Sequence, residues 1–288
     1  MVEAKCAVVT GANSGMGFAT SVALARAGYR VVMLCRNAER GGAALAAAKT
    51  AVPDAAGGIE LEVCDLANLA SVRSCAERLR GRLDGLDVLV ANAGLISPER
   101  KETADGFELQ FGVNHLGHFL LTVLVLPLVK KARGRIVVVS SGAHKVGRIH
   151  WDDLRLVKSY SAFGAYGQSK LANILFTREL ARRLAGTGAT ANCLNPGAVG
   201  TNMGVDRETG FGRTVMGLLR PFFQTPEAGA DTAIYLATAP EVADVSGAYF
   251  YRRKIAKTSA RARDDAAAAR LWATSEALTG APETPVPA

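Results

Sequence analysis

Six short apolar runs, separated by longer segments of helical periodicity, constrain the possible folds of this chain most strongly. The runs are rich in Val, Leu and Ile and lie at residues 6–10, 30–34, 59–63, 88–91, 136–140 and 190–194. Near-continuous apolar runs of this length are typical of strands in a parallel sheet that is covered on both faces. We predict helices over 15–27, 38–51, 69–82, 106–131 and 162–184, a last helix over 226–237 and a strand around 249–251. This alternation predicts an α/β protein with one open, doubly wound parallel sheet and helices on both faces.

No repeat or linker divides the 288 residues, so we expect one domain over residues 1–281 and a disordered tail over 282–288. Hydrophobic residues make up 49% of the chain and charged residues 21%, a soluble globular composition. The net charge of +8 is scattered in short clusters, which we interpret as solvated faces, with an anionic cofactor or a membrane surface as the alternative. No basic stripe alternates with aromatic residues, so nucleic acid is not an expected partner.

The five cysteines form no Cys-x-x-Cys pair and no metal-ligand cluster, so we expect reduced, buried thiols, no metal site and a cytoplasmic protein. The first apolar run begins almost at Met1, which leaves no room for a signal or transit peptide. The apolar run over 116–129 contains His118 and Pro127 and is too short to span a bilayer. We expect it to be a buried helix in which the histidine is a packing residue.

A glycine-rich turn lies between the first predicted strand and the first predicted helix. Such a turn lets the backbone approach a pyrophosphate closely and offers it the amides of the helix N-terminus. The spacing is Gly-x-x-x-Gly-x-Gly and differs from the commoner Gly-x-Gly-x-x-Gly fingerprint. A tight turn without a ligand is the alternative, but the strand–turn–helix context favours a dinucleotide site. The cofactor-binding residues expected here are Gly11, Asn13, Ser14, Gly15, Met16 and Gly17.

The end of the second predicted strand, Leu34-Cys35-Arg36-Asn37, bears on the choice between NAD and NADP. A site that prefers NAD places an acidic residue here, which hydrogen-bonds to the ribose 2′-hydroxyl. A carboxylate would repel a 2′-phosphate, whereas a guanidinium pairs with it. We therefore expect NADP(H), with Arg36 as the main discriminator, Arg40 as a weaker one and Asn37 beside them. The alternative is that Arg36 is an ordinary surface charge.

Three further stretches follow predicted strands at their carboxyl ends, where ligands bind in sheets of this kind. Asp65-Leu66 is placed to contact the adenine edge, and the small residues of Asn92-Ala93-Gly94 allow the backbone to pack against the adenosine ribose. After the sixth strand, backbone and side chains are placed to hold the nicotinamide carboxamide. The candidates there are Pro196, Gly197, Val199 and Thr201.

Tyr166 and Lys170 are one helical turn apart and therefore share a face of their helix. A free tyrosine has a pKa of about 10, and a nearby ammonium together with a cationic nicotinamide favours the phenolate. Lys170 is also placed to hydrogen-bond the cofactor ribose. A Tyr-x-x-x-Lys pair occurs by chance on many polar helices. Combined with the upstream glycine turn, it predicts hydride transfer to or from a nicotinamide cofactor.

Two other polar groups are candidates for the same site. Ser140-Ser141 ends the fifth predicted strand, where a hydroxyl can bind the reacting oxygen and stabilise its developing charge. Asn114 lies in the long helix and is placed to hold a water beside Lys170. An asparagine in mid-helix is otherwise unfavourable, which favours such a role.

On these residues the chain resembles the short-chain dehydrogenase/reductase family, with its Rossmann-type fold, in the branch that contains retinol dehydrogenases. The resemblance covers nearly the whole chain and includes residues 111–119, residues 169–173 and the 25-residue interval between Ser141 and Tyr166. It implies that Tyr166 is the proton donor or acceptor and that Lys170 and Asn114 complete a proton relay. It also implies that Ser141, rather than Ser140, orients the substrate.

The expected function is that of an NADP-dependent carbonyl reductase or alcohol dehydrogenase acting on an apolar aldehyde or ketone. Residues 202–225 lose the regular alternation and are interpreted as a substrate lid that also offers a membrane contact, with a core-packed helix as the alternative. His144, Trp151 and Tyr160 are further pocket candidates, with packing as the alternative. A non-catalytic NADP-binding scaffold or redox sensor and a protochlorophyllide-reductase-like activity are the competing functions. The helices over 106–131 and 162–184 are candidates for pairing in a homo-oligomer.

Overall fold

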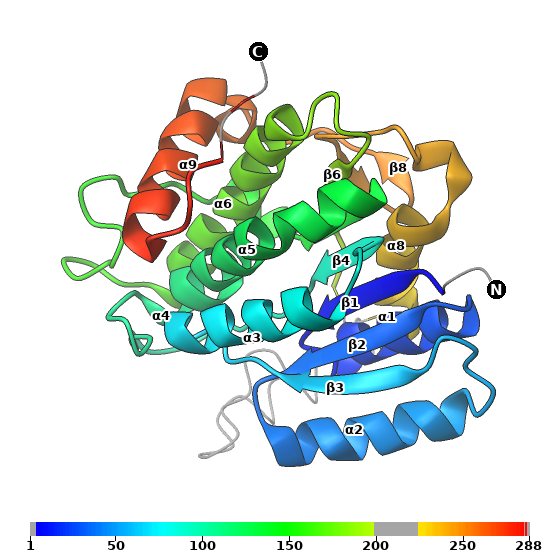
Figure 1. Cartoon of the computed structure of the whole chain (residues 1–288). Helices are drawn as coiled ribbons and strands as arrows, with labels where there is room; N and C mark the ends of the chain where they lie inside the picture. The colour runs from blue at the N-terminus through cyan, green and yellow to red at the C-terminus, as the bar shows by residue number, and fades with distance from the viewer. Residues whose placement is uncertain (1–3, 199–223, 285, 287–288) are drawn as a thin grey trace.

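One eight-stranded sheet runs through the part of the chain that the computed structural model describes, residues 4–198, 224–284 and 286. The strand order is β3-β2-β1-β4-β5-β6-β7-β8, and every neighbouring pair is parallel except the antiparallel β7 and β8 (Figure 1). The strands are β1 (Cys6–Thr10), β2 (Arg30–Cys35), β3 (Ile59–Val63), β4 (Val88–Ala91), β5 (Arg135–Val139), β6 (Thr190–Asn195), β7 (Tyr249–Tyr251) and β8 (Lys254–Ile255).

The strand order reverses at β1, which pairs with β2 on one side and with β4 on the other. In open α/β sheets, ligands bind in the crevice beyond the carboxyl ends of the strands at such a switch point. The turn after β1 and the loop after β4 meet here because Val9 is in register with Val90. The topology therefore brings the glycine turn and the stretch 92–94 to the same edge of the sheet.

Helices cover both faces of the sheet, since successive residues of a strand point to opposite sides. Val8 and Val32 belong to the core that packs under α3, α5, α6 and α9, whereas Ala7 and Val31 belong to the core under α1, α2 and α8 (Figure 1). The predicted doubly wound architecture is confirmed. The helices are α1 (Gly15–Arg26), α2 (Ala38–Ala51), α3 (Leu69–Arg82), α4 (Leu109–Phe111), α5 (Gly117–Ala132), α6 (Ala162–Arg183), α8 (Pro226–Thr238) and α9 (Asp265–Thr279).

The helix predicted over 106–131 is present as one helical stretch, Leu109–Ala132, that begins three residues later than predicted. Within it the short α4 is followed by a π-helical turn, Gly112–Leu116, which was not predicted, and then by α5. A Cβ at Gly112 would lie 2.3 Å from Cγ2 of Thr103, so the turn packs against its neighbours without room for a side chain there. All five residues of the turn are buried, and a segment buried on every side gives no apolar periodicity from which its register could be inferred.

One helical stretch among the described residues, Leu109–Ala132, is long and apolar enough to cross a membrane by length and composition alone. Its most apolar window has a mean hydropathy of 1.6, but 83% of that window is buried inside the protein. Core helices of soluble proteins meet the same criterion. The segment that we expected to be a buried helix therefore lies in the core beside the sheet.

The prediction that the helix over 226–237 is the last one is wrong, because α9 follows it. Asp264 caps α9 by accepting a hydrogen bond from the Ala267 amide at 2.9 Å. Trp272 of α9 is 1% exposed, and its ring lies 4.9 Å from that of Phe119 and 4.4 Å from the guanidinium of Arg183. The buried residues of α9 recur at helical spacing but are mostly small or polar, so Trp272 supplies the largest apolar contact of the helix. They are Ala268, Leu271, Trp272, Ser275 and Thr279.

The described part of the C-terminal tail is tied to α9 and α6. The Thr284 amide donates a hydrogen bond of 3.2 Å to Glu276, and the Arg183 guanidinium donates to the Thr284 carbonyl oxygen. All described elements pack around one sheet, which supports the single-domain interpretation.

Candidate active site

The glycine turn connects β1 to α1 at the switch point of the sheet. Gly11 and Gly15 have φ values of +65° and +56°, which side-chain-bearing residues rarely adopt. A Cβ at Gly17 would lie 2.3 Å from the carbonyl oxygen of Gly11 and 2.6 Å from Nδ2 of Asn92. Only a glycine lets the first turn of α1 approach the strand end this closely.

The residues between these glycines leave the start of α1 open to a ligand. Ser14 is the N-cap residue, but its side chain makes no capping hydrogen bond. The first amides of α1 are thus available to an anion such as a pyrophosphate. Met16 is buried, Asn13 is half-buried and Ser14 is exposed.

Thr10 fastens the turn after β1 to the loop after β4. Its Oγ1 accepts hydrogen bonds from the amides of Asn92 and Ala93, both at 2.9 Å. Nδ2 of Asn92 donates in return to the Thr10 carbonyl oxygen at 2.8 Å. The expected cofactor stretch over 92–94 is therefore held rigidly beside the glycine turn. The sequence analysis assigned no role to Thr10.

Arg36 is exposed just beyond the end of β2, and no carboxylate occupies that position. The strand end is next to the glycine turn, because the Gly11 amide donates to the Leu34 carbonyl oxygen at 2.9 Å. Asn37 is the N-cap of α2, and its Oδ1 accepts from the Arg40 amide at 2.8 Å. Arg36 is thus exposed at the strand end beside the glycine turn, whereas the Asn37 oxygen is already engaged.

Asp65 and Leu66 follow β3 and have different roles. Oδ1 of Asp65 accepts from the Ala67 amide at 3.0 Å, so this carboxylate shapes its own turn. The Asp65 side chain is half-buried and lies at the ligand edge of the sheet. Leu66 is 7% exposed, and its carbonyl oxygen would lie 2.5 Å from a Cβ at Gly117. Leu66 is therefore a packing residue against α5.

Tyr166, Ser141 and Lys170 come together at the ends of β5 and α6. A hydrogen bond with the Ser141 side chain lowers the pKa of Tyr166, but burial has the larger effect and raises that pKa above its ordinary value of 10. Nζ of Lys170 lies 5.5 Å from the centroid of the Tyr166 ring. In the protein alone, burial therefore outweighs the hydrogen bond, and the pKa of the Tyr166 phenol lies above that of a free tyrosine.

Lys170 is 1% exposed, and burial lowers its pKa from the ordinary value of 10.5 to about 8. Nζ donates to the carbonyl oxygen of Val139 at 3.0 Å, at the end of β5. The ammonium is therefore fixed in one place, close to Tyr166. A Cβ at Gly94 would lie 3.5 Å from Nζ. Because Gly94 has no side chain, a ligand at the carboxyl ends of the strands can approach the lysine there.

The structure separates the two adjacent serines. The hydroxyl of Ser140 is 1% exposed and donates to the Lys170 carbonyl oxygen at 2.8 Å, which ties α6 to β5. Ser141 is half-buried and its side chain reaches Tyr166, while its Oγ also accepts from the Ala143 amide at 3.2 Å. The geometry thus gives Ser140 a structural role and leaves Ser141 as the hydroxyl beside the phenol.

Asn114 lies in the π-helical turn and joins three segments. Its Oδ1 accepts from the Leu95 amide at 2.9 Å, and its Nδ2 donates to the Leu95 carbonyl oxygen and to Oγ of Ser169, each at 3.0 Å. A Cβ at Gly94 would lie 3.4 Å from Oδ1 of Asn114 and 3.5 Å from Nζ of Lys170, so both groups border the same space beside Gly94. The amide clamps the loop after β4 to α6. Ser169, one residue before Lys170, is the partner that sequence reasoning missed.

Pro196 and Gly197 follow β6 at the same edge. Gly197 has a φ of +85°, and its amide donates to Oδ1 of Asn195 at 3.0 Å. Val199 and Thr201, also expected at the cofactor site, lie outside the described residues, as does the expected lid except for Gln224 and Thr225.

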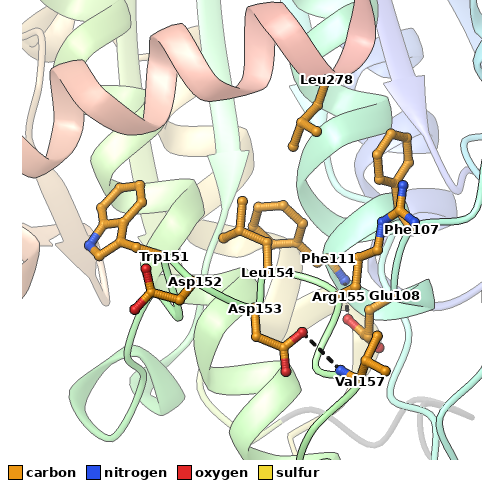
Figure 2. A pocket seen from close by; sticks show the side chains of 10 residues that line it. All are labelled: Phe107, Glu108, Phe111, Trp151, Asp152, Asp153, Leu154, Arg155, Val157 and Leu278. Atoms are coloured by element: carbon orange, nitrogen blue, oxygen red, sulfur yellow. Dashed lines mark hydrogen bonds between the residues drawn. The ribbon is translucent and has the colours of Figure 1, made fainter.

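A cavity of about 260 Å³ is separate from this set of residues, and Figure 2 shows its lining. It lies between Phe107, Trp151 and Leu278, and none of the candidate catalytic or cofactor-binding residues lines it. Of the three residues expected to line a substrate pocket, Trp151 thus lines this separate cavity.

His144 and Tyr160, the other two residues expected to line a substrate pocket, make hydrogen bonds to backbone carbonyl groups. Nδ1 of His144 lies 2.7 Å from the Ser141 carbonyl oxygen, and the Tyr160 hydroxyl donates to the Ser97 carbonyl oxygen at 2.7 Å. In the described chain, no group of three or more His, Cys, Asp or Glu side chains is arranged to hold a metal ion.

Comparison with known proteins decides which family this geometry belongs to. Residues 5–210 match the family model described as short chain dehydrogenase. The chain belongs to this family. This short chain dehydrogenase is 46% identical to retinol dehydrogenase 14 of Mus musculus, over 97% of its own length and 87% of the relative's. It is 43% identical to retinol dehydrogenase 13 of Homo sapiens, over 97% and 86% of the two chains.

A solved structure supports the same assignment. The short chain dehydrogenase matches the crystal structure of an uncharacterized protein from Mycobacterium Paratuberculosis with a TM-score of 0.76 and 37% identity, over 98% of its own chain and 95% of the other. The predicted family, its retinol dehydrogenase-like branch and the Rossmann-type fold are confirmed. The protein is an oxidoreductase of a family that binds a nicotinamide cofactor and acts on small molecules. The open N-terminus of α1 and the side-chain-free approach at Gly94 fit such a cofactor.

Proposed function

We propose that this oxidoreductase transfers a hydride between NADP(H) and an apolar aldehyde or ketone, in the manner of a carbonyl reductase or retinol dehydrogenase-like alcohol dehydrogenase. The observation that carries the proposal is the hydrogen bond between Tyr166 and Ser141, one helical turn from the buried Lys170. These three groups lie at the sheet edge where the glycine turn begins. The names of the relatives, retinol dehydrogenases, favour an apolar alcohol or aldehyde as the substrate class.

When bound, NADPH would supply the hydride that the carbonyl carbon of the substrate accepts. The Ser141 hydroxyl is placed to hold the carbonyl oxygen, and Tyr166 donates its proton to that oxygen as negative charge develops there. Burial favours the protonated phenol, because it raises the pKa of Tyr166, and a protonated phenol is the form that reduction requires. Lys170 stabilises the phenolate that remains until solvent returns a proton.

The preference for NADP(H) rests on the exposed Arg36 beyond β2, where no carboxylate opposes a 2′-phosphate. Dissociation constants for NADPH and NADH, measured by fluorescence titration, test this preference directly. Tighter binding of NADH by the unaltered protein would contradict it. Arg36→Ser should weaken NADPH binding about tenfold or more while NADH binding changes little, because a charge-assisted pair to phosphate is lost.

The decisive experiment follows NADPH oxidation with a panel of apolar aldehydes, ketones and quinones. Tyr166→Phe should retain NADPH binding and lose turnover, since it removes only the acidic hydroxyl. Turnover by Tyr166→Phe at the rate of the unaltered protein would refute the assignment. NADPH binding without reduction of any carbonyl would favour the scaffold or sensor function instead.

The location and assembly of the protein are part of the proposal. The five cysteines are free and buried, which supports a reducing, cytoplasmic setting. A homo-oligomer through α5 and α6 would have to accommodate α9, which lies along α6 (Figure 1). Light scattering on the purified chain tests this arrangement.

A further inference from the structure

His118 connects two parts of the candidate site that are far apart in the sequence. It lies in α5 and is 2% exposed. Its Nδ1 lies 3.2 Å from the backbone carbonyl oxygen of Asn114, and its Nε2 lies 2.8 Å from Oγ1 of Thr10. Thr10 ends β1 just before the glycine turn, and Asn114 clamps the loop that lies beside Lys170. The imidazole therefore bridges the end of β1, next to the glycine turn, and the π-helical turn that contains Asn114.

The partners of the two ring nitrogens determine the tautomer of His118. A carbonyl oxygen only accepts hydrogen bonds, so the nitrogen facing it, Nδ1, must carry a hydrogen. Oγ1 of Thr10 already accepts from two backbone amides at 2.9 Å, which occupies both of its lone pairs. Its single hydrogen must therefore be donated, and Nε2 at 2.8 Å is a nearer acceptor than the Val90 carbonyl oxygen at 3.4 Å. The satisfied arrangement is a neutral ring with hydrogen on Nδ1 only.

The surroundings keep this ring neutral. Burial lowers the pKa of His118 to about 4, and the charge of Lys170 acts in the same direction. A protonated ring would also carry a hydrogen on Nε2, directed at a hydroxyl whose lone pairs are already in use. One polarised chain of hydrogen bonds thus runs from the Asn92 and Ala93 amides through Thr10 and His118 to the Asn114 carbonyl oxygen.

We infer that His118 is a positioning residue. As the neutral Nδ1–H tautomer, it joins the Thr10 hydroxyl to the Asn114 carbonyl oxygen. It thereby holds the π-helical turn that contains Asn114 in register with the glycine turn after β1. The buried ring acts through these two neighbours. Its effect on turnover rests on the proposed function, whereas its tautomer does not.

Two substitutions separate the two links. The amide of an asparagine reaches about the position of Nδ1, and that of a glutamine reaches about the position of Nε2. His118→Asn should keep the link to Asn114 but lose the acceptor for Thr10, so the Kd for NADPH rises about tenfold while kcat stays near that of the unaltered protein. His118→Gln should keep the link to Thr10, so kcat falls about tenfold with little change in Kd.

Phe119 provides the control. It is also fully buried in α5, directly after His118, but its ring packs against Trp272 of α9 at 4.9 Å. Phe119→Leu should lower stability and leave both Kd and kcat unchanged. If the His118 variants change no more than this control, the positioning role is wrong.

A spectrum of the unaltered protein tests the tautomer without any variant. Two-bond ¹H–¹⁵N correlation NMR distinguishes protonated from unprotonated ring nitrogens, and the chain has only four histidines. We expect the His118 signal, assigned by its loss in His118→Asn, to show hydrogen on Nδ1 and none on Nε2 at pH 7. Hydrogen on Nε2 would overturn the inference. If the unaltered protein neither binds NADPH nor reduces a carbonyl, the proposed function fails while the tautomer result still stands.

Discussion

Replacing Lys170 by methionine should make the protein more stable while abolishing its proposed activity. The ammonium is buried, and its pKa falls from 10.5 to about 8 on folding. The unfolded chain therefore binds this proton more tightly than the folded one does, which costs about 3 kcal/mol of folding free energy at pH 7. Methionine fills a similar space without a charge. It gives up the hydrogen bond to Val139, worth about 1 kcal/mol, but Asn173 still donates to that carbonyl oxygen at 3.2 Å. The expected gain is about 2 kcal/mol.

The pH dependence distinguishes this reasoning from ordinary repacking. Because the folded pKa lies below the unfolded one, the penalty is fully present below about pH 8 and fades as pH rises toward 10.5. The free energies of unfolding of the two proteins, measured by urea titration with tryptophan fluorescence, should therefore converge between pH 8 and 10. Lys131→Met is the control, since this side chain is 67% exposed and should show no pH-dependent gap. A Lys170→Met protein that is less stable at pH 7, or a gap that does not vary with pH, would refute the argument.

Three other substitutions test separate parts of the structure. Gly17→Ala should abolish NADPH binding, measured by fluorescence titration, because its Cβ would lie 2.3 Å from the Gly11 carbonyl oxygen; binding at the original affinity would show that the turn need not be this tight. Trp272→Ala should lower the free energy of unfolding by about 3 to 5 kcal/mol in urea titrations, since it empties the contact of α9 with α5 and α6; a loss below about 1 kcal/mol would mean that α9 is not docked as described. Asn37→Ala should cost about 1 kcal/mol of stability as a lost helix cap and leave the ratio of NADPH to NADH affinities unchanged, whereas a changed ratio would assign Asn37 to the cofactor.

Much of the fold could be predicted because its signals are local. The first four strands were located to within a residue, since each is a continuous apolar run between turn residues. The glycine turn was equally clear, because positive φ and close backbone approach restrict the residue type. α9 was missed because its buried face consists mostly of small and polar residues, and its largest contacts, those of Trp272 with Phe119 and Arg183, are long-range. Its caps, Asp264 and Gly280, were a signal that could have revealed it.

The sequence by itself determined the order of strands and helices, the edge at which the ligand site forms and the pairing of Tyr166 with Lys170 on one helical face. These follow from periodicity and from spacing within a few residues. Only the tertiary structure decided that Asn37 is a helix cap and that His118 reaches Thr10. The last two partners are 108 residues apart, and hydrogen bonds across such a separation depend on how strands and helices pack rather than on any local pattern.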